Sequence, residues 1–363
     1  MKSTKRLPRN TIVWICALLL VIFIRLFSSN ENRVESFYTW GIYPFISKTL
    51  RLIFGWIPFS FGDILYITAA IWLLFKIIKN IQNIFKRGFH KPTFFKKILS
   101  SLLVLVFVYI VFNILWGFNY DRKGIALQLE LQNMFYDTSD VKLLQKVLLE
   151  KVNASKSLLI EKNILYPEKK EVFRRAESCY YEAEKKYPFL QYKKISVKSS
   201  MYGRAGNYLG FTGYYNPFTG EAQVNTSVPE FLEPYITTHE IAHQLGYAKE
   251  NEANFVGYLA AVNSTDILFH YSTYLDLFMY ANREVYYFDS TASKQSFALL
   301  NAGVKKDIEE WKEFNLAHQS FIEPAITWMY GKYLKLNQQP KGMRSYNEVI
   351  SMLIAYYKKY GEI

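Results

Sequence analysis

The apolar run at residues 98–118 constrains this chain more than any other feature. Its sequence, ILSSLLVLVFVYIVFNILWGF, contains no charged side chain. About 20 apolar residues in a helix cross the hydrocarbon core of a bilayer. The run therefore predicts a membrane span, and the apolar runs at 11–27 and 60–77 predict two more.

Two of these runs have an alternative interpretation. Residues 11–27 could form a secretory signal peptide, but no small-residue cleavage site follows them and further apolar runs do. Residues 40–58 could instead form a re-entrant or interfacial segment, with 60–77 as a buried helix. We expect three uncleaved spans within a membrane region of residues 1–118.

Basic residues are concentrated in two places beside these runs. They precede the first run and lie at or between the second and third, namely Lys2, Lys5, Arg6, Arg9, Lys76, Lys79, Lys86, Arg87, Lys91, Lys96 and Lys97. Cytoplasmic segments carry such an excess of lysine and arginine. Three spans that start in the cytoplasm predict that everything after residue 118 is extracytoplasmic, at the cytoplasmic membrane of a bacterium.

The distribution of charge along the chain argues against a nucleic-acid partner. The chain carries +13, but residues 1–117 contain 15 basic and 3 acidic residues, which leaves 29 and 28 for the rest. A domain that binds nucleic acid through phosphates needs its own basic face. Two cysteines, Cys16 and Cys179, are too few for a disulfide framework, so a hydrophobic core must hold the fold.

Residues 119–363 have the pattern of a mostly helical domain with a small β-ribbon. Apolar spacing and charge predict helices at 138–163, capped by Ser139, and at 168–186, 228–262, 266–288, 293–335 and 344–359. The alternating run 193–202 predicts a strand, and the Gly- and Tyr-rich segment 203–225 predicts a turn-rich ribbon that ends in a strand.

An HExxH motif lies in the segment THEIAHQLG. His239 and His243 are four residues apart, so on a helix both imidazoles lie on one face and can bind a single zinc ion. Glu240 follows the first histidine and could take a proton from a water molecule that the metal makes more acidic. This spacing predicts a zinc-dependent hydrolase with Glu240 as general base.

A catalytic zinc needs a third protein ligand and one open position. A continuation of the type HxxGxxH would need histidine at position 249, where this chain has Lys249. The following segment, ENEANF, instead resembles the ExxAD and ExEAN signatures of gluzincin-type metallopeptidases. That resemblance implies Glu250 as the ligand and Asn254 as a hydrogen-bond partner of a histidine ligand, and Glu252 is the reserve ligand.

The connection from His243 to Glu250 is short. The helix must therefore end sharply near Gly246 if Glu250 is to return to the histidines.

The ribbon before the motif is a candidate for substrate contacts. An extended peptide could pair with the strand at 217–225 by β-augmentation, although a simple hairpin is an equal interpretation of GYYNPFTG. The residues that could contact substrate are Tyr214, Tyr215, Gln223 and Asn225. Tyrosines are more often packing residues in a chain with 29 of them.

The whole sequence also resembles a bacterial membrane-protein family known only as a domain of unknown function. The resemblance rests on the three apolar runs, WGFNYDR at 116–122, GYYNPFTGEAQVN, THEIAHQLGYAKENEANF and SYNEVISMLIAYY at 345–357. It implies a zincin-like metallopeptidase domain of the gluzincin type and no particular substrate.

These patterns together predict an α+β zincin-like domain at 119–363 behind three transmembrane helices. We expect a membrane-anchored zinc metallopeptidase with one zinc ion, a peptide or protein substrate in the cell envelope, and the lipid bilayer as its other partner. The alternative is a noncatalytic envelope-scaffolding module with a structural metal, which would be closed by four protein ligands.

Overall fold

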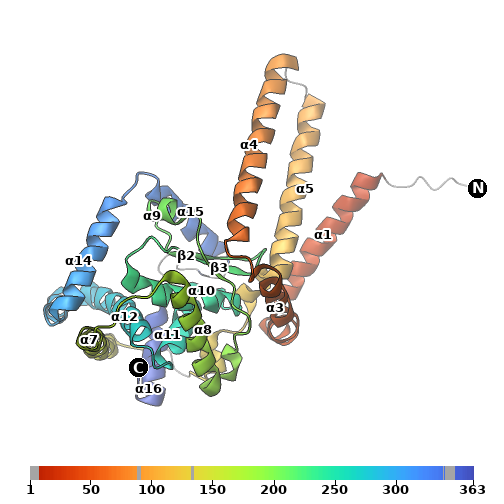
Figure 1. Ribbon diagram of the computed structural model, residues 1–363. Coiled ribbons are helices and arrows are strands. Elements are labelled where there is room, and N and C mark those ends of the chain that lie inside the picture. Colours follow the sequence, from red (N-terminus) through yellow and green to blue (C-terminus); the bar gives the residue numbers. More distant parts are fainter. Residues whose placement is uncertain (1–7, 88–90, 132–134, 338, 340–347) are drawn as a thin grey trace, which may run out of the picture. The chain divides into compact units, whose positions relative to one another are not determined.

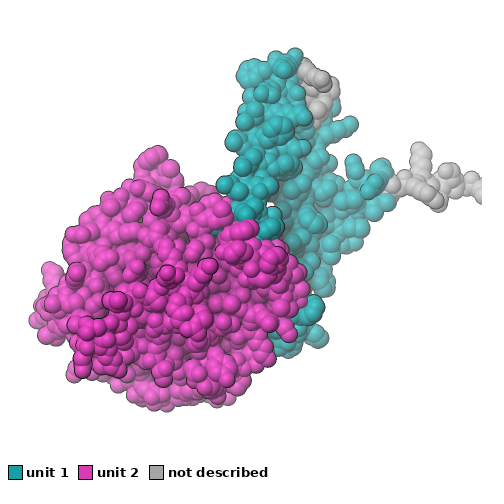
Figure 2. All heavy atoms as spheres, viewed as in Figure 1, with its two compact units in different colours: residues 1–46, 61–122 teal, residues 47–60, 123–363 magenta. Residues whose placement is uncertain are grey.

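A computed structural model describes residues 8–87, 91–131, 135–337, 339 and 348–363 (Figure 1). The chain divides into two compact units, drawn in different colours in Figure 2. Unit 1 comprises residues 1–46 and 61–122, and unit 2 comprises residues 47–60 and 123–363. The predicted boundary at residue 118 places the segment 47–60 in the membrane region, whereas the structure assigns this segment to unit 2.

Unit 1 contains three helices that are long and apolar enough to cross a membrane. They are α1 (Arg9–Ser28), α4 (Phe61–Arg87) and α5 (Lys91–Leu115). The second span was predicted at 60–77, but its helix extends ten residues further because the segment after Ile77 keeps helical apolar spacing. The third was predicted to reach residue 118 and ends at Leu115, where a 3₁₀ turn, η2 (Gly117–Asp121), follows.

Between α1 and α4 the chain is helical. The elements are α2 (Glu31–Arg33), a π-helix η1 (Val34–Ile42) and α3 (Tyr43–Phe54), whose second half belongs to unit 2. Tyr38 of η1 donates a hydrogen bond of 3.0 Å to the carbonyl of Ile114 and packs edge-on against Phe118. These contacts hold η1 against the C-terminal end of α5.

Unit 2 is built mostly from helices around one core. The long ones include α7 (Thr138–Glu161), α8 (Lys169–Lys186) and α12 (Ile267–Phe288). Helices α8 and α12 pack with α10 (Glu233–Gln244) and α11 (Glu250–Val262), and α7 packs with α12. The remaining helical elements are α6 (Ile125–Gln128), η3 (Pro188–Leu190), α9 (Gly203–Asn207), η4 (Glu230–Leu232), α13 (Ser290–Ala298), α14 (Ala302–Ala317), α15 (Glu323–Leu336) and α16 (Val349–Tyr360).

Two details of these helices differ from the sequence-based expectations. The helix predicted at 228–262 is interrupted, because α10 ends at Gln244 and α11 starts at Glu250. The cap of α7 is Asp137 rather than Ser139, and the carboxylates of Asp137 and Asp140 form a capping box. The start of the last predicted helix, residues 344–347, lies outside the described residues.

A three-stranded sheet lies against α10. Its strands are β1 (Val197–Ser199), β2 (Gly213–Asn216) and β3 (Glu221–Val224), in the order β1-β3-β2. β1 runs parallel to β3, and β2 runs antiparallel to it. The segment 203–225 ends in a strand, as its sequence predicted, but it begins with the short helix α9, which was not predicted. β3 is fully buried between the other two strands.

The segment 47–60 is anchored in unit 2 by buried polar contacts. The hydroxyl of Ser47 donates to the backbone carbonyl of Gln244 at 2.7 Å, and the Arg51 guanidinium donates to the same carbonyl at 3.3 Å. Arg51 also lies over the ring of Tyr192. A cation at the C-terminal end of a helix stabilises it through the helix dipole, so Arg51 stabilises the end of α10.

Candidate metal centre

Helix α10 is the buried centre of unit 2. It packs against α8, α11, α12 and the sheet. Inside the helix, the hydroxyls of Thr237 and Thr238 donate to the carbonyls one turn earlier, and Tyr180 of α8 donates to the Thr238 carbonyl at 2.6 Å. These bonds satisfy polar groups that would otherwise be costly to bury. They hold His239 and His243 on a rigid helix.

Gly246 ends this helix as the sequence predicted. Its φ is +88°, a left-handed conformation that glycine adopts without strain. The Gly246 amide donates to the His243 carbonyl, and the Tyr247 amide donates to the Ala242 carbonyl. These two bonds form a Schellman motif. The chain then reverses and begins α11 at Glu250.

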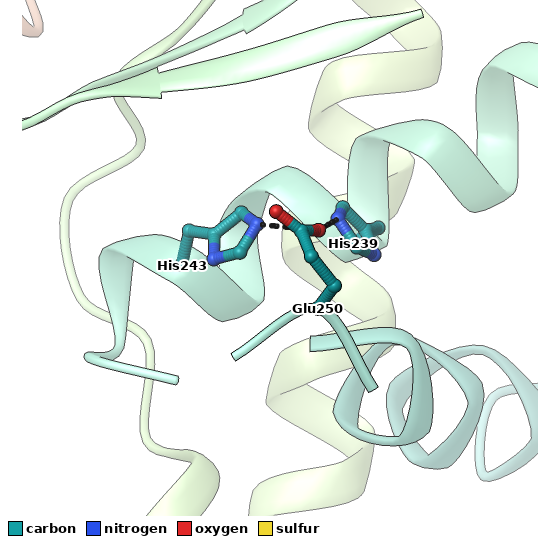
Figure 3. A group of neighbouring side chains, drawn as sticks. All are labelled: His239, His243 and Glu250. Atoms are coloured by element: carbon teal, nitrogen blue, oxygen red, sulfur yellow. Dashed lines mark ion pairs between the residues drawn. The ribbon is translucent and has the colours of Figure 1, made fainter. Parts of the chain in front are cut away.

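The reversal brings three side chains together. One ligand atom from each of His239, His243 and Glu250 lies within 4.8 Å of the other two. Nε2 of His239 is 3.2 Å from Oε2 of Glu250, and Nε2 of His243 is 3.6 Å from the same oxygen. Figure 3 shows both rings directed at this carboxylate. The triad could hold a metal ion.

The electrostatics of the triad reflect this close approach. Burial opposes ionisation of both His243 and Glu250. The carboxylate of Glu250 nevertheless raises the pKa of His243 to about 9, and the two histidines lower the pKa of Glu250. A metal cation would replace the proton that these groups share, because ligands bind metals in their deprotonated forms.

Tyr330 and Gln339 support Glu250. The Tyr330 hydroxyl, on α15, donates to Oε1 of Glu250 at 2.7 Å, and the Glu250 amide donates to the side-chain oxygen of Gln339 at 3.1 Å. Neither residue belongs to the HExxH segment, so the motif gave no indication of either. Their positions, 80 and 89 residues after Glu250, depend on tertiary packing.

The histidines have different partners on their second nitrogens. Nδ1 of His243 lies 2.7 Å from the backbone carbonyl of Tyr247. Such a contact fixes the ring and leaves Nε2 for a metal. Among the described residues, Nδ1 of His239 has no hydrogen-bond partner.

The predicted bond from Asn254 to a histidine ligand is not present in the structure. The Asn254 side chain interacts with the Tyr280 hydroxyl, while its backbone carbonyl accepts from the Tyr235 hydroxyl at 2.9 Å. The Schellman turn provides the partner of His243 instead, because it places the Tyr247 carbonyl against that ring.

Asp276 of α12 lies within electrostatic range of His239, and the sequence analysis did not identify it. Burial raises the pKa of Asp276 to about 6, and the histidine opposes this shift.

Glu240 is buried beside the triad and against the sheet. A Cβ added at Gly213, the first residue of β2, would lie 2.4 Å from Oε1 of Glu240. A glycine at position 213 therefore leaves space for the Glu240 carboxylate. Oε2 of Glu240 has no hydrogen-bond partner among the described side chains and backbone groups. Burial raises the pKa of Glu240 to about 7, and the neighbouring histidines oppose this shift.

Glu252, the reserve ligand, lies outside the triad. One of its oxygens is 3.6 Å from the Lys249 ammonium group, and a Cβ at Gly124 would lie 2.6 Å from this oxygen. Glu252 follows Glu250 by two residues, which rotates its side chain away from the face that carries Glu250. The expectation that Glu252 could replace Glu250 is therefore not supported.

The four candidate substrate residues of the ribbon have mixed positions. Gln223 is fully buried with its amide on the Ser60 hydroxyl, and Asn225 is bonded to Asn207 and Phe211. Both side chains therefore form hydrogen bonds that stabilise the fold. Tyr214 and Tyr215 are half-buried on β2, and the Tyr214 hydroxyl lies 2.9 Å from that of Ser200. Their contact with a substrate stays a prediction.

The predicted addition of a peptide to the strand at 217–225 is wrong. The strand in this segment is β3, and both of its edges are already paired, with β1 on one side and β2 on the other. A peptide cannot pair with a strand whose edges are occupied.

Comparison with known proteins identifies one family. The model of a family described as "Protein of unknown function (DUF3810)" matches residues 38–354, which includes the triad, the sheet and the second and third apolar helices. No curated protein and no solved structure matches the chain. The chain belongs to the DUF3810 family of proteins of unknown function.

Proposed function

We propose that this protein is a membrane-anchored, zinc-dependent hydrolase, and that it cleaves peptide bonds. The observation that carries the proposal is the convergence of His239, His243 and Glu250, with Glu240 buried next to them. Two imidazoles and one carboxylate are a ligand set of catalytic zinc sites.

The number of ligands favours a catalytic site over a structural one. A structural zinc is closed by four protein ligands, whereas a catalytic zinc keeps one position open. Within the described part of the chain, the metal-binding cluster has three members, and Glu252 is directed elsewhere. This arrangement supports the hydrolase over a scaffolding module with a structural metal.

The chain's own residues would divide the chemistry between them. Zinc in this site would supply Lewis acidity, which polarises a carbonyl group and makes a water molecule more acidic. His239, His243 and Glu250 would hold the ion, and Tyr330 would orient Glu250. Glu240 would accept a proton from the attacking water at Oε2 and return it to the leaving amine.

The substitution Glu240→Gln tests the assignment of the general base. It removes the basic oxygen and keeps the size of the side chain. We expect the zinc content of the purified full chain to stay at the wild-type value, while hydrolysis falls by at least about a hundredfold. The exposed residue Glu230 provides a matched control, because Glu230→Gln makes the same chemical change outside the site.

Because the substrate is not known, the assay should sample many peptide bonds. Mass spectrometry of new protein N-termini in cells that express each variant does so. Wild type and Glu230→Gln should generate a set of cleavage products that Glu240→Gln lacks. Identical sets of N-termini for wild type and Glu240→Gln would contradict the proposal.

We also propose that unit 2 lies outside the cytoplasmic membrane. The three candidate spans and the basic residues that flank them support this orientation. Alkaline phosphatase fused after residue 120 should be active, since it folds only where disulfides form. Activity of a reporter that folds only in the cytoplasm, fused at the same position, would contradict the orientation.

A further inference from the structure

Helix α15 has two opposite faces of different character. Its inner face consists of Ile326, Tyr330 and Leu334, of which Leu334 is fully buried and Tyr330 bonds to Glu250. The spacing of four residues between these positions makes a single stripe along the helix. These three positions form the face of the helix that is turned toward unit 2.

The outer face of α15 is apolar and exposed. Trp328 is 65% exposed, Met329 60% and Leu336 83%. In the segment that leads directly into the helix, Phe321 is 92% exposed and Ile322 43%. Large apolar side chains this exposed, and this close together, mark a surface that contacts another apolar phase.

Two lysines accompany these side chains. Lys332 and Lys335 are exposed on α15, and the Lys332 ammonium group lies 5.5 Å from the centre of the Trp328 ring. Glu323, in the first turn, is the acidic residue of the helix and is half-buried. Tryptophan, aliphatic residues and lysine together are typical of helices that lie in the plane of a membrane surface.

The covalent structure tethers unit 2 to the candidate spans at two places. Ser60 of unit 2 directly precedes Phe61, where the second candidate span begins. Unit 2 resumes at Lys123, and the eight residues from Trp116 to Lys123 can extend at most about 28 Å. A domain tethered this closely meets lipid at a high effective concentration.

We infer that the outer face of α15, together with Phe321 and Ile322, is a membrane-docking surface that inserts into the interfacial region of the bilayer. The lysines complement anionic lipid headgroups there. One rigid helix then contacts lipid on its outer face and the metal ligand Glu250 on its inner face. The docking surface stands on exposure, charge and tethering, and does not depend on the hydrolase proposal.

The test places a fluorophore on this surface in the full-length chain. Met329→Cys and Leu336→Cys, each in a Cys16→Ala, Cys179→Ala background, carry an environment-sensitive label. Each protein is reconstituted as a single copy in nanodiscs made of an equal mixture of phosphatidylcholine and phosphatidylglycerol. Lys185→Cys is the matched control, because Lys185 is exposed on α8, a different helix of unit 2.

Labels at 329 and 336 should show blue-shifted emission. Doxyl-labelled phosphatidylcholine should quench more than about half of their fluorescence, because interfacial helices bury their apolar face roughly 5–10 Å deep. The label at 185 should show neither effect. Equal, weak quenching at all three positions would overturn the inference, and so would a blue shift that requires two copies per nanodisc, which would identify a second copy of the chain as the partner.

Discussion

The hydroxyl of Tyr330 donates a 2.7 Å hydrogen bond to Oε1 of Glu250, while Oε2 of the same carboxylate faces both histidines. The two oxygens of Glu250 therefore have separate tasks. One is fixed by α15, and the other could bind a metal ion.

Replacement of Tyr330 tests this division. Tyr330→Phe removes the hydrogen bond and keeps the aromatic ring at this position of α15. Loss of such a supporting partner typically weakens metal affinity about 10- to 100-fold. Zinc affinity, measured by competition with a chelator, should fall by this factor, whereas Tyr286→Phe, at an exposed tyrosine of α12, should leave it unchanged. Equal affinities for wild type and Tyr330→Phe would show that the bond does not support the ligand.

Gly213→Ala tests the packing of β2 against Glu240. The new methyl group would lie 2.4 Å from Oε1 of Glu240, so either the carboxylate or the strand must move. A misplacement of about 1 Å at a catalytic group can cost about a hundredfold in rate. We expect wild-type zinc content with greatly reduced formation of cleavage products.

The control for Gly213→Ala is Gly41→Ala, because a Cβ at Gly41 would meet its nearest neighbour at an ordinary 3.7 Å. Wild-type cleavage by Gly213→Ala would show that Glu240 does not need the space that Gly213 leaves.

Arg51→Met tests whether the segment 47–60 stabilises α10. The substitution removes the hydrogen bond to the Gln244 carbonyl and the cation over Tyr192. Hydrogen bonds to charged groups contribute about 1.5–3 kcal/mol, and for a domain of this size each kcal/mol corresponds to about 2–4 °C in the melting temperature. The melting temperature of the full chain in detergent should fall by several degrees.

Lys48→Met is the matched change on the exposed side of the same helix and should shift the melting temperature by less than about 1 °C. If both variants have the same melting temperature as the wild type, Arg51 does not stabilise α10.

Cys179 should be unreactive in the folded protein. Its thiol is buried, and burial raises its pKa to about 12. Because the thiolate is the reactive form, iodoacetamide at pH 8 should label Cys179 only after unfolding. Mass spectrometry of the labelled peptide measures this. Rapid labelling of Cys179 in the native chain would contradict its buried position.

Much of the fold follows from patterns that are local in sequence. The apolar runs predicted the three candidate spans, and Gly246, with the short connection to Glu250, predicted the sharp end of α10. These features depend on a few consecutive residues, so a single sequence contains the information. The boundary of unit 2 does not, because Ser47 and Arg51 reach Gln244 from almost 200 residues away.

The site was predicted in part for the same reason. HExxH gave His239, Glu240 and His243 by helical spacing alone, and the resemblance to gluzincin signatures gave Glu250. Tyr330 and Gln339 come from distant elements and could not be found from spacing. Contact of Gln223 and Asn225 with substrate stays a prediction. An alternating pattern shows that a strand is present, but not that this strand, β3, is the central strand of the sheet.

The most direct test of the account is the metal content of the purified full-length chain and of its His243→Ala variant, measured by mass spectrometry of the elements. Wild type, purified without chelators and supplied with zinc, should contain about one zinc ion per chain, and His243→Ala should contain almost none. His318→Ala, on a histidine outside the triad, should match the wild type. A wild-type chain that takes up no divalent metal, or a His243→Ala variant that retains as much zinc as the wild type, would contradict the metal centre.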